Sequence, residues 1–224
     1  MVNSDDNINE TNYNPETHFK LEDCVNIEKV KNLNIVDNEV SNLFMNCINL
    51  TQVINSNITC SGKNMFRCCV NLIDIPEKNN ISTIVISDNS AEGMFVCCNK
   101  LQYSKIQKVL VKNPNITNFN YFMFGKSHEN DTTINLNNYS KATTMSYAFS
   151  ESTFSEPNAS RINFSDNDIT ITFNGTLPSD ITSVSRTFTQ SAEKHKFVFT
   201  NFANLIKNCT KLKSIMGMFL YMKI

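Results

Sequence analysis

The chain has 224 residues, a formal net charge of −1 and 41% hydrophobic residues, which is enough apolar material for a sizeable core. Its near-neutral charge provides no basic field for a phosphate backbone, so we expect no nucleic-acid partner.

The first twenty residues, MVNSDDNINETNYNPETHFK, carry acids and amides where a secretory signal needs a basic start and an apolar run. We expect residues 1–20 to form a polar N-terminal extension or cap. No later stretch approaches the roughly 18 apolar residues of a membrane span, so we expect no membrane insertion. The compartment stays open at this point.

A short template recurs once the cysteines are aligned, and it reads Φ-x-x-Cys-x-x-Leu, where Φ is apolar. LFMNCINL, MFRCCVNL, MFVCCNKL and LIKNCTKL match it, and an earlier copy begins at Leu21. Three further copies keep Phe and replace Cys by Ser. The predicted repeat-core residues are Leu21, Cys24, Phe44, Cys47, Leu50, Phe66, Cys69, Leu72, Phe95, Cys98, Leu101, Phe124, Phe149, Phe188, Ile206, Cys209 and Leu212.

Apolar residues at i, i+3 and i+6 predict a stripe along a short helix or helical turn that faces a core. The small Cys or Ser is expected where neighbouring coils approach most closely. Three β-branched or aromatic stretches, at residues 82–86, 169–173 and 196–199, predict strands. Each unit is therefore strand, turn and short helix, and only stacking of units can make a core.

The predicted solenoid covers residues 21–215 in about eight irregular repeats, and residues 216–224 form an apolar end or an incomplete repeat. The longest spacing lies between Phe149 and Phe188, where solenoids commonly place binding loops. It contains Glu156-Pro157-Asn158 and the hairpin turn signal Asn174-Gly175. This insertion is the first candidate for a recognition element.

The MF-x-x-C-x-x-L core, preceded by Asn at Asn42, Asn64 and Asn204, resembles the BspA-like leucine-rich repeats of bacterial and protist surface proteins. The resemblance runs from about Leu21 to Ile215. It implies an α/β repeat fold, a right-handed solenoid with a parallel strand face and short helices or helical turns. It also implies roles in adhesion or protein recognition at the cell surface or outside the cell. The family carries no common catalytic residue.

The residues give no argument for catalysis, a cofactor or a metal. The vicinal pairs Cys68-Cys69 and Cys97-Cys98 lack zinc-ligand spacing, so we interpret them as a structural ladder of reduced thiols. The histidines (His18, His128 and His195) stand in polar surroundings and are expected at the surface. The segment Asp166-Asn167-Asp168 resembles part of a calcium loop, but it lacks the Gly and Glu that complete one. We therefore expect a non-enzyme.

Two functions remain open. The first is a recognition module that binds a protein or glycan partner through its strand face or its inter-repeat insertions. The second is a structural subunit of a virion, cell-surface or cytoskeletal assembly, docked through its solenoid edge. The candidate assembly edge is Met218, Phe219 and Leu220. Burial of Phe219 and Leu220 by another subunit would favour assembly, and packing of both back onto Leu212 and Ile215 would favour a free module.

Overall fold

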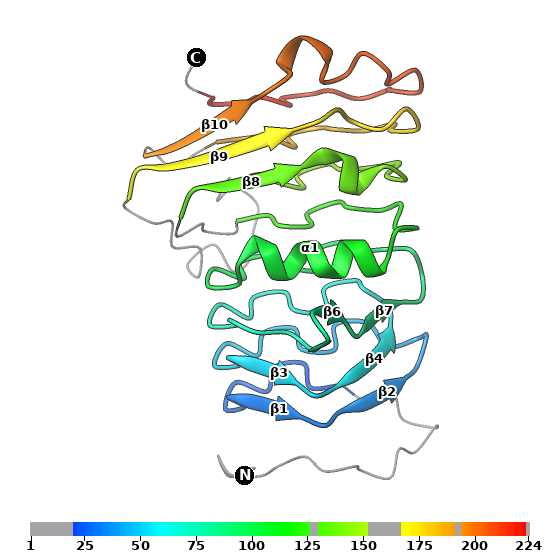
Figure 1. The fold of residues 1–224 in the computed structure, drawn as a ribbon, viewed down its shortest axis with the longest axis vertical. Helices are drawn as coiled ribbons and strands as arrows, with labels where there is room; N and C mark the ends of the chain where they lie inside the picture. Colours follow the sequence, from blue (N-terminus) through cyan, green and yellow to red (C-terminus); the bar gives the residue numbers. More distant parts are fainter. Residues whose placement is uncertain (1–19, 126–129, 152–166, 191–193, 223–224) are drawn as a thin grey trace.

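The computed structural model describes residues 20–125, 130–151, 167–190 and 194–222. They form a β-solenoid of about six turns with repeats of about 26 residues. Figure 1 shows the coils stacked in chain order, with the N-terminal and C-terminal ends at opposite ends of the stack. The predicted solenoid of parallel strands is confirmed. Within the described ranges, no helix is long and apolar enough to cross a membrane.

Short strands lie in equivalent positions of successive coils and pair in parallel. In the N-terminal half, the parallel pairs are β1 (Lys29–Lys31) with β3 (Gln52–Ile54), and β2 (Asn34–Val36) with β4 (Asn57–Cys60) and then β7 (Ile84–Ile86). The exception is the antiparallel pair β5 (Glu77–Lys78) and β6 (Ile81–Ser82). In the C-terminal half, the parallel order is β8 (Thr132–Asn135), β9 (Ile169–Asn174) and β10 (His195–Phe199).

The recurring template forms consecutive tight turns and not the short helix or helical turn predicted for each repeat, and the described residues hold little helix. The Cys47 N–H donates to the Phe44 carbonyl at 3.1 Å, and the Leu50 N–H donates to the Cys47 carbonyl at 3.0 Å. Asn46 is the third residue of the first of these two turns, and its φ is +61°, which a right-handed helix does not allow. Turns that close every three residues give the same i, i+3, i+6 apolar pattern as a helix. The described chain holds little helix, namely α1 (Tyr103–Lys112) and two 3-10 turns at Leu136–Tyr139 and Phe202–Asn204.

A positive φ explains two of the asparagines that precede the template, Asn42 and Asn64. The Met65 N–H donates to the Gly62 carbonyl, which places Asn64, with φ of +52°, at the third position of the turn. Such a position favours Asn or Gly, because other residues pay a steric cost there. Gly93 takes this position one coil later with φ of +62°. A Cβ on Gly93 would lie 2.2 Å from the Asn64 Oδ1 atom, so glycine also makes room for the neighbouring coil.

The core is a stack of Phe side chains that runs along the solenoid axis. Phe44 and Phe66 stack with ring centroids 5.3 Å apart, and Phe66 and Phe95 follow at 5.8 Å. Toward the C-terminal end, Phe149 and Phe188 stack at 5.8 Å. Every one of these rings is buried. Aromatic rings of successive coils therefore pack against one another along much of the solenoid axis.

Two template copies, at Phe124 and Ile206, do not occupy the position in the Phe stack that the sequence alignment assigns to them. Phe124 is buried with Cys68, Val96 and Cys97 in a small separate cluster, outside the Phe stack. The Phe95 N–H donates to the Phe122 carbonyl, as the Phe66 N–H donates to the Met94 carbonyl one coil earlier. This register aligns Met123, and not Phe124, with Phe95 in the stack. The one-residue difference was invisible in the sequence, because Phe122, Met123 and Phe124 are all apolar.

The copy at Ile206 is also shifted. Ile206 is 43% exposed, whereas Phe219 stacks on Phe188 with centroids 5.8 Å apart. A parallel bridge between Ser183 and Ser214 sets this register, since Phe188 and Phe219 each follow their serine by the same number of residues. Cys209 and Leu212 pack half-buried at the edge of the core. The spacing of LIKNCTKL matches the template, but the segment lies on another side of the coil.

A single helix, α1 (Tyr103–Lys112), interrupts the strand ladder. It buries Tyr103, Ile106, Val109 and Leu110 against the core. Beyond its C-terminal end, the Asn113 side chain accepts from the Ile86 N–H at 2.8 Å and donates to the Ile84 carbonyl at 3.0 Å, which ties the helix to β7. In Figure 1, α1 occupies the face of the stack between β7 and β8, where other coils have a strand.

Candidate functional site

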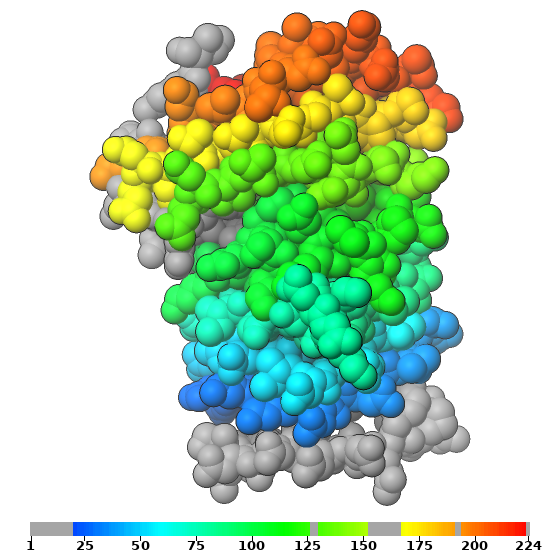
Figure 2. Space-filling view, in the orientation of Figure 1, coloured from blue at the N-terminus to red at the C-terminus, as the bar shows by residue number. Residues whose placement is uncertain are grey.

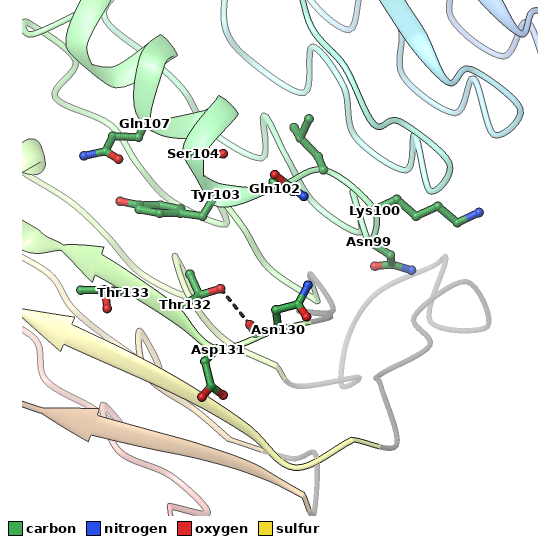
Figure 3. Close-up of a pocket in the computed structure, with 11 residues that line it drawn as sticks. Asn99, Lys100, Gln102, Tyr103, Ser104, Gln107, Asn130, Asp131, Thr132 and Thr133 are labelled. Carbon is green, nitrogen blue, oxygen red and sulfur yellow. Dashed lines mark hydrogen bonds between the residues drawn. The ribbon is translucent and has the colours of Figure 1, made fainter.

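The interruption by α1 creates a hollow on the side of the solenoid. Because α1 replaces a strand, β8 becomes an edge strand of its sheet, with β9 as its hydrogen-bonded neighbour. A cavity of about 390 Å³ opens between the start of α1 and the start of β8. Figure 3 shows side chains from these two elements on either side of it. Its lining residues are Asn99, Lys100, Leu101, Gln102, Tyr103, Ser104, Gln107, Asn130, Asp131, Thr132 and Thr133.

The lining of this hollow is dominated by amides and hydroxyls. Gln102, Ser104 and Gln107 are exposed on the α1 side, and amides both donate and accept hydrogen bonds. Across the hollow, the Thr132 hydroxyl donates to the Asn130 carbonyl at 3.0 Å, which holds the start of β8 in place. The volume falls within the range of small-molecule sites, roughly 300–1,000 Å³.

Tyr103 lies at the back of the hollow and is only 8% exposed. Its hydroxyl oxygen is 3.3 Å from that of Tyr139, and burial raises the pKa of the Tyr103 hydroxyl. The phenol therefore stays protonated and neutral at physiological pH. Tyr103 supplies a rigid wall and only a small exposed ring surface.

A second, more open hollow of about 480 Å³ continues from the first. It is lined by Asn130, Asp131, Asn167, Asp168 and Ile169, so the two hollows share Asn130 and Asp131. We call the two together the polar groove. At their junction, the Asp131 Oδ1 atom accepts from the Thr170 N–H at 2.7 Å, which anchors this carboxylate to β9.

The groove residues do not assemble a metal site. Among the described residues, no group of three or more His, Cys, Asp or Glu side chains is placed to hold a metal ion. Asp131 and Asp168 are both exposed. Their carboxylates can accept hydrogen bonds from a ligand, and they give the second hollow a negative charge.

The vicinal cysteines divide between two clusters. Cys69 and Cys98 lie in the main core, whereas Cys68 and Cys97 lie in the small cluster around Phe124. The Cys69 Sγ atom donates to the Phe44 carbonyl of the preceding coil at 3.0 Å. Burial raises the pKa of the Cys69 thiol well above its usual value. The template cysteine thus links successive coils as a protonated thiol.

The expectation of surface histidines is wrong for His195, which is 2% exposed. Its Nδ1 atom lies 2.5 Å from the Glu151 Oε1 atom, and both side chains are buried. The signal was present in the sequence: His195 alternates with Phe197 and Phe199 along β10, so it points to the same face. His18 and His128 lie outside the described residues.

The structure describes only part of the insertion between Phe149 and Phe188 that the sequence predicts as a recognition element. Residues 156–158 lie outside the described ranges. Asn174 ends β9, and both partners of β9 run parallel to it, so the predicted hairpin at Asn174-Gly175 is wrong. Gly175 instead has φ of +94°, and a Cβ there would lie 2.7 Å from the Asn137 Oδ1 atom. The glycine therefore serves a close approach between coils.

The last coil carries the candidate assembly edge. Met218 is buried, and Phe219 and Leu220 are half-buried. Phe219 contacts rings of its own chain, including Phe188 and Phe202. Around it, the last coil exposes a group of large apolar side chains: Phe202, Ile206, Ile215, Met216 and Tyr221. Figure 2 shows this coil as the orange and red end of the stack.

Comparison with protein-family models, curated proteins and solved structures finds no match to this chain.

Proposed function

We propose that the chain is a non-catalytic recognition module of the adhesion type, and that the polar groove binds a glycan. The observation that carries this proposal is the groove itself, a concave surface lined by amides, hydroxyls and carboxylates on a stacked scaffold. Such a lining matches the many hydroxyls of a sugar, each of which can both donate and accept hydrogen bonds. Two of these side chains, Thr132 and Asp131, are already held by hydrogen bonds to the backbone, which lowers the entropic cost of binding at these two positions.

A glycan suits the groove better than a protein does. Protein interfaces draw most of their binding energy from aromatic, Arg or apolar anchors that enter pockets. In the first hollow Leu101 is fully buried and Tyr103 is 8% exposed, so the lining offers little apolar surface to such an anchor. The remaining side chains that line it are polar.

We also propose that the chain is a divergent member of the BspA-like leucine-rich-repeat group and that its solenoid is right-handed. The Φ-x-x-Cys-x-x-Leu copies and the preceding Asn residues support this assignment. The adhesion role follows from the same resemblance and carries no weight independent of it.

The proposal is tested by incubating the labelled protein with an array of neutral and acidic glycans. Gln102→Ala and Gln107→Ala remove exposed amides from the groove and should each weaken the signal by roughly tenfold, as expected for a lost hydrogen bond of 1–1.5 kcal/mol. Val111→Ala is the matched control, because Val111 is an exposed α1 residue that does not line the groove. Binding that is unaffected by both groove variants would refute the site.

A second candidate function is a subunit that assembles through its last coil. The exposed apolar side chains of that coil, with Met216 at 67% and Phe202 at 58%, favour it. We assign a second copy of this chain as the occupant, because a coil of the same kind best complements the repeated contacts between coils. Light scattering coupled to size-exclusion chromatography tests this. An oligomer that becomes monomeric in Met216→Lys would support assembly, and a monomer at all concentrations would refute it.

A further inference from the structure

We infer that the polar groove takes a neutral oligosaccharide of at least two sugar units, one in each hollow, with Asp131 at the junction. This inference rests on the proposed glycan-binding function and adds the length and the charge of the ligand. It follows from how the two hollows are joined and from where the charged side chains lie.

The inferred length of the ligand follows from the residues that line both hollows. The first hollow measures about 390 Å³ and the second about 480 Å³, and Asn130 and Asp131 line both. A single sugar can contact only one hollow and the junction. A ligand with two or more units contacts both hollows, and the second unit binds without a second loss of translational freedom. Affinity should therefore rise steeply between one unit and two.

The inference that the ligand is neutral follows from Asp131 and Asp168. Both are exposed and line the second hollow, and the other described residues that line it are neutral. Among the described residues that line the first hollow, Lys100 alone carries a positive charge. A uronic or sulfated sugar in the second hollow would bring like charges together, which costs affinity. A neutral sugar instead donates hydroxyl protons to these carboxylates in charge-assisted hydrogen bonds, which are stronger than neutral ones.

Asp131 is positioned for this role. Its Oδ1 atom accepts from the Thr170 N–H at 2.7 Å, which fixes the carboxylate at the start of β9. A carboxylate accepts about four hydrogen bonds in total, so Asp131 retains capacity for a ligand. Asp131→Asn keeps one oxygen acceptor for the Thr170 N–H, removes the charge and replaces the second acceptor oxygen by an NH2 donor, at nearly unchanged side-chain size.

The test is isothermal titration calorimetry with the full chain. The neutral probes are maltotriose, cellotriose, mannotriose and triacetylchitotriose, each beside its monosaccharide, and the acidic probe is trigalacturonate. We expect one neutral trisaccharide to bind at least roughly tenfold more tightly than its monosaccharide and than trigalacturonate. Asp131→Asn and Asp168→Asn should each weaken the neutral ligand by roughly tenfold and reduce the discrimination against trigalacturonate. Glu28→Gln, an exposed acid of the N-terminal coil, is the control and should change nothing.

Equal affinity for the monosaccharide and the trisaccharide would overturn the two-unit ligand. Trigalacturonate binding as tightly as the neutral probes would overturn the neutral ligand. In both cases Gln102→Ala would still weaken binding, and the proposed glycan-binding function would stand. If no probe binds, both this inference and the proposed function are wrong.

Discussion

Replacing Cys69 by Leu tests how the coils are held together. Cys69 is fully buried in the main core, and its thiol contacts the Phe44 carbonyl of the preceding coil at 3.0 Å. The coil that follows supplies Cys98, whose thiol reaches the Phe66 carbonyl at the same distance of 3.0 Å. A Leu side chain at position 69 is larger than Cys and cannot donate a hydrogen bond. It must push the coils apart or leave its preferred rotamer.

Overpacking of a filled core costs roughly 1–3 kcal/mol. For a chain of this size, 1 kcal/mol lowers Tm by roughly 2–4 °C, so we expect a fall of roughly 2–12 °C. Differential scanning calorimetry of the reduced protein measures it. Cys69→Ser, which keeps a small donor, should lose less stability than Cys69→Leu. Cys24→Leu is the matched control, because Cys24 occupies the same template position in the first coil and is half-exposed.

A Cys69→Leu protein that melts within about 1 °C of wild type would refute the tight contact between coils. Equal losses in Cys69→Leu and Cys24→Leu would also refute it. The loss of stability would then mean that Leu is unfavourable at this template position in any coil, whether or not the position is buried.

Three further predictions concern other contacts. Gly93→Ala should lower stability by roughly 1–2 kcal/mol in urea denaturation, because φ of +62° strains Ala and its Cβ would displace the Asn64 amide; an unchanged midpoint would contradict this. His195→Leu should cost roughly 3–5 kcal/mol, because it leaves the Glu151 carboxylate buried without its His partner, and Glu151→Leu in the same chain should recover part of the loss in a thermal melt. Burial raises the pKa of the Cys47 thiol from 9.0 to about 12, so the folded protein holds this proton more tightly than the unfolded chain does. Its contribution is present below about pH 9 and is lost as the pH rises toward 12; Cys47→Ala should therefore flatten the fall in stability between about pH 9 and 11, and an identical pH profile would refute the assignment.

The repeat and its parallel strands could be predicted because they depend on side chains that recur. Phe, Cys and Leu at fixed spacing reveal a stacked core, and β-branched stretches such as residues 169–173 reveal strands. The spacing alone could not separate a helical turn from consecutive tight turns, since both bring every third residue to one face. The positive φ of Asn46 decides between them, and the asparagines of the template were the available signal.

Helix α1 was missed although its signal is strong. The sequence YSKIQKVLVK buries Tyr103, Ile106, Val109 and Leu110, which is the spacing of an amphipathic helix. The repeat template aligns residues on either side of this segment and assigns no element to the segment itself. The polar groove was missed for the same reason, because it exists only where α1 replaces a strand beside β8. Its residues are ordinary surface amides and hydroxyls until that topology is known.

The register of the last coil depends on contacts distant in sequence. Ile206 fits the template by spacing, but the bridge between Ser183 and Ser214 assigns the stack position to Phe219. A local pattern cannot reveal which coil pairs with which. At the candidate assembly edge, Phe219 continues the Phe stack, and neighbours such as Ile215 and Met216 are exposed.

Hydrogen–deuterium exchange with and without the tightest neutral trisaccharide tests the central claim most directly. We predict slower exchange at residues 102–104 and 130–133, which line the groove from α1 and β8, and no change in the last coil. Slower exchange confined to residues 215–221 at high protein concentration, with no effect of any glycan on the groove, would contradict glycan recognition. It would instead support assembly through the last coil.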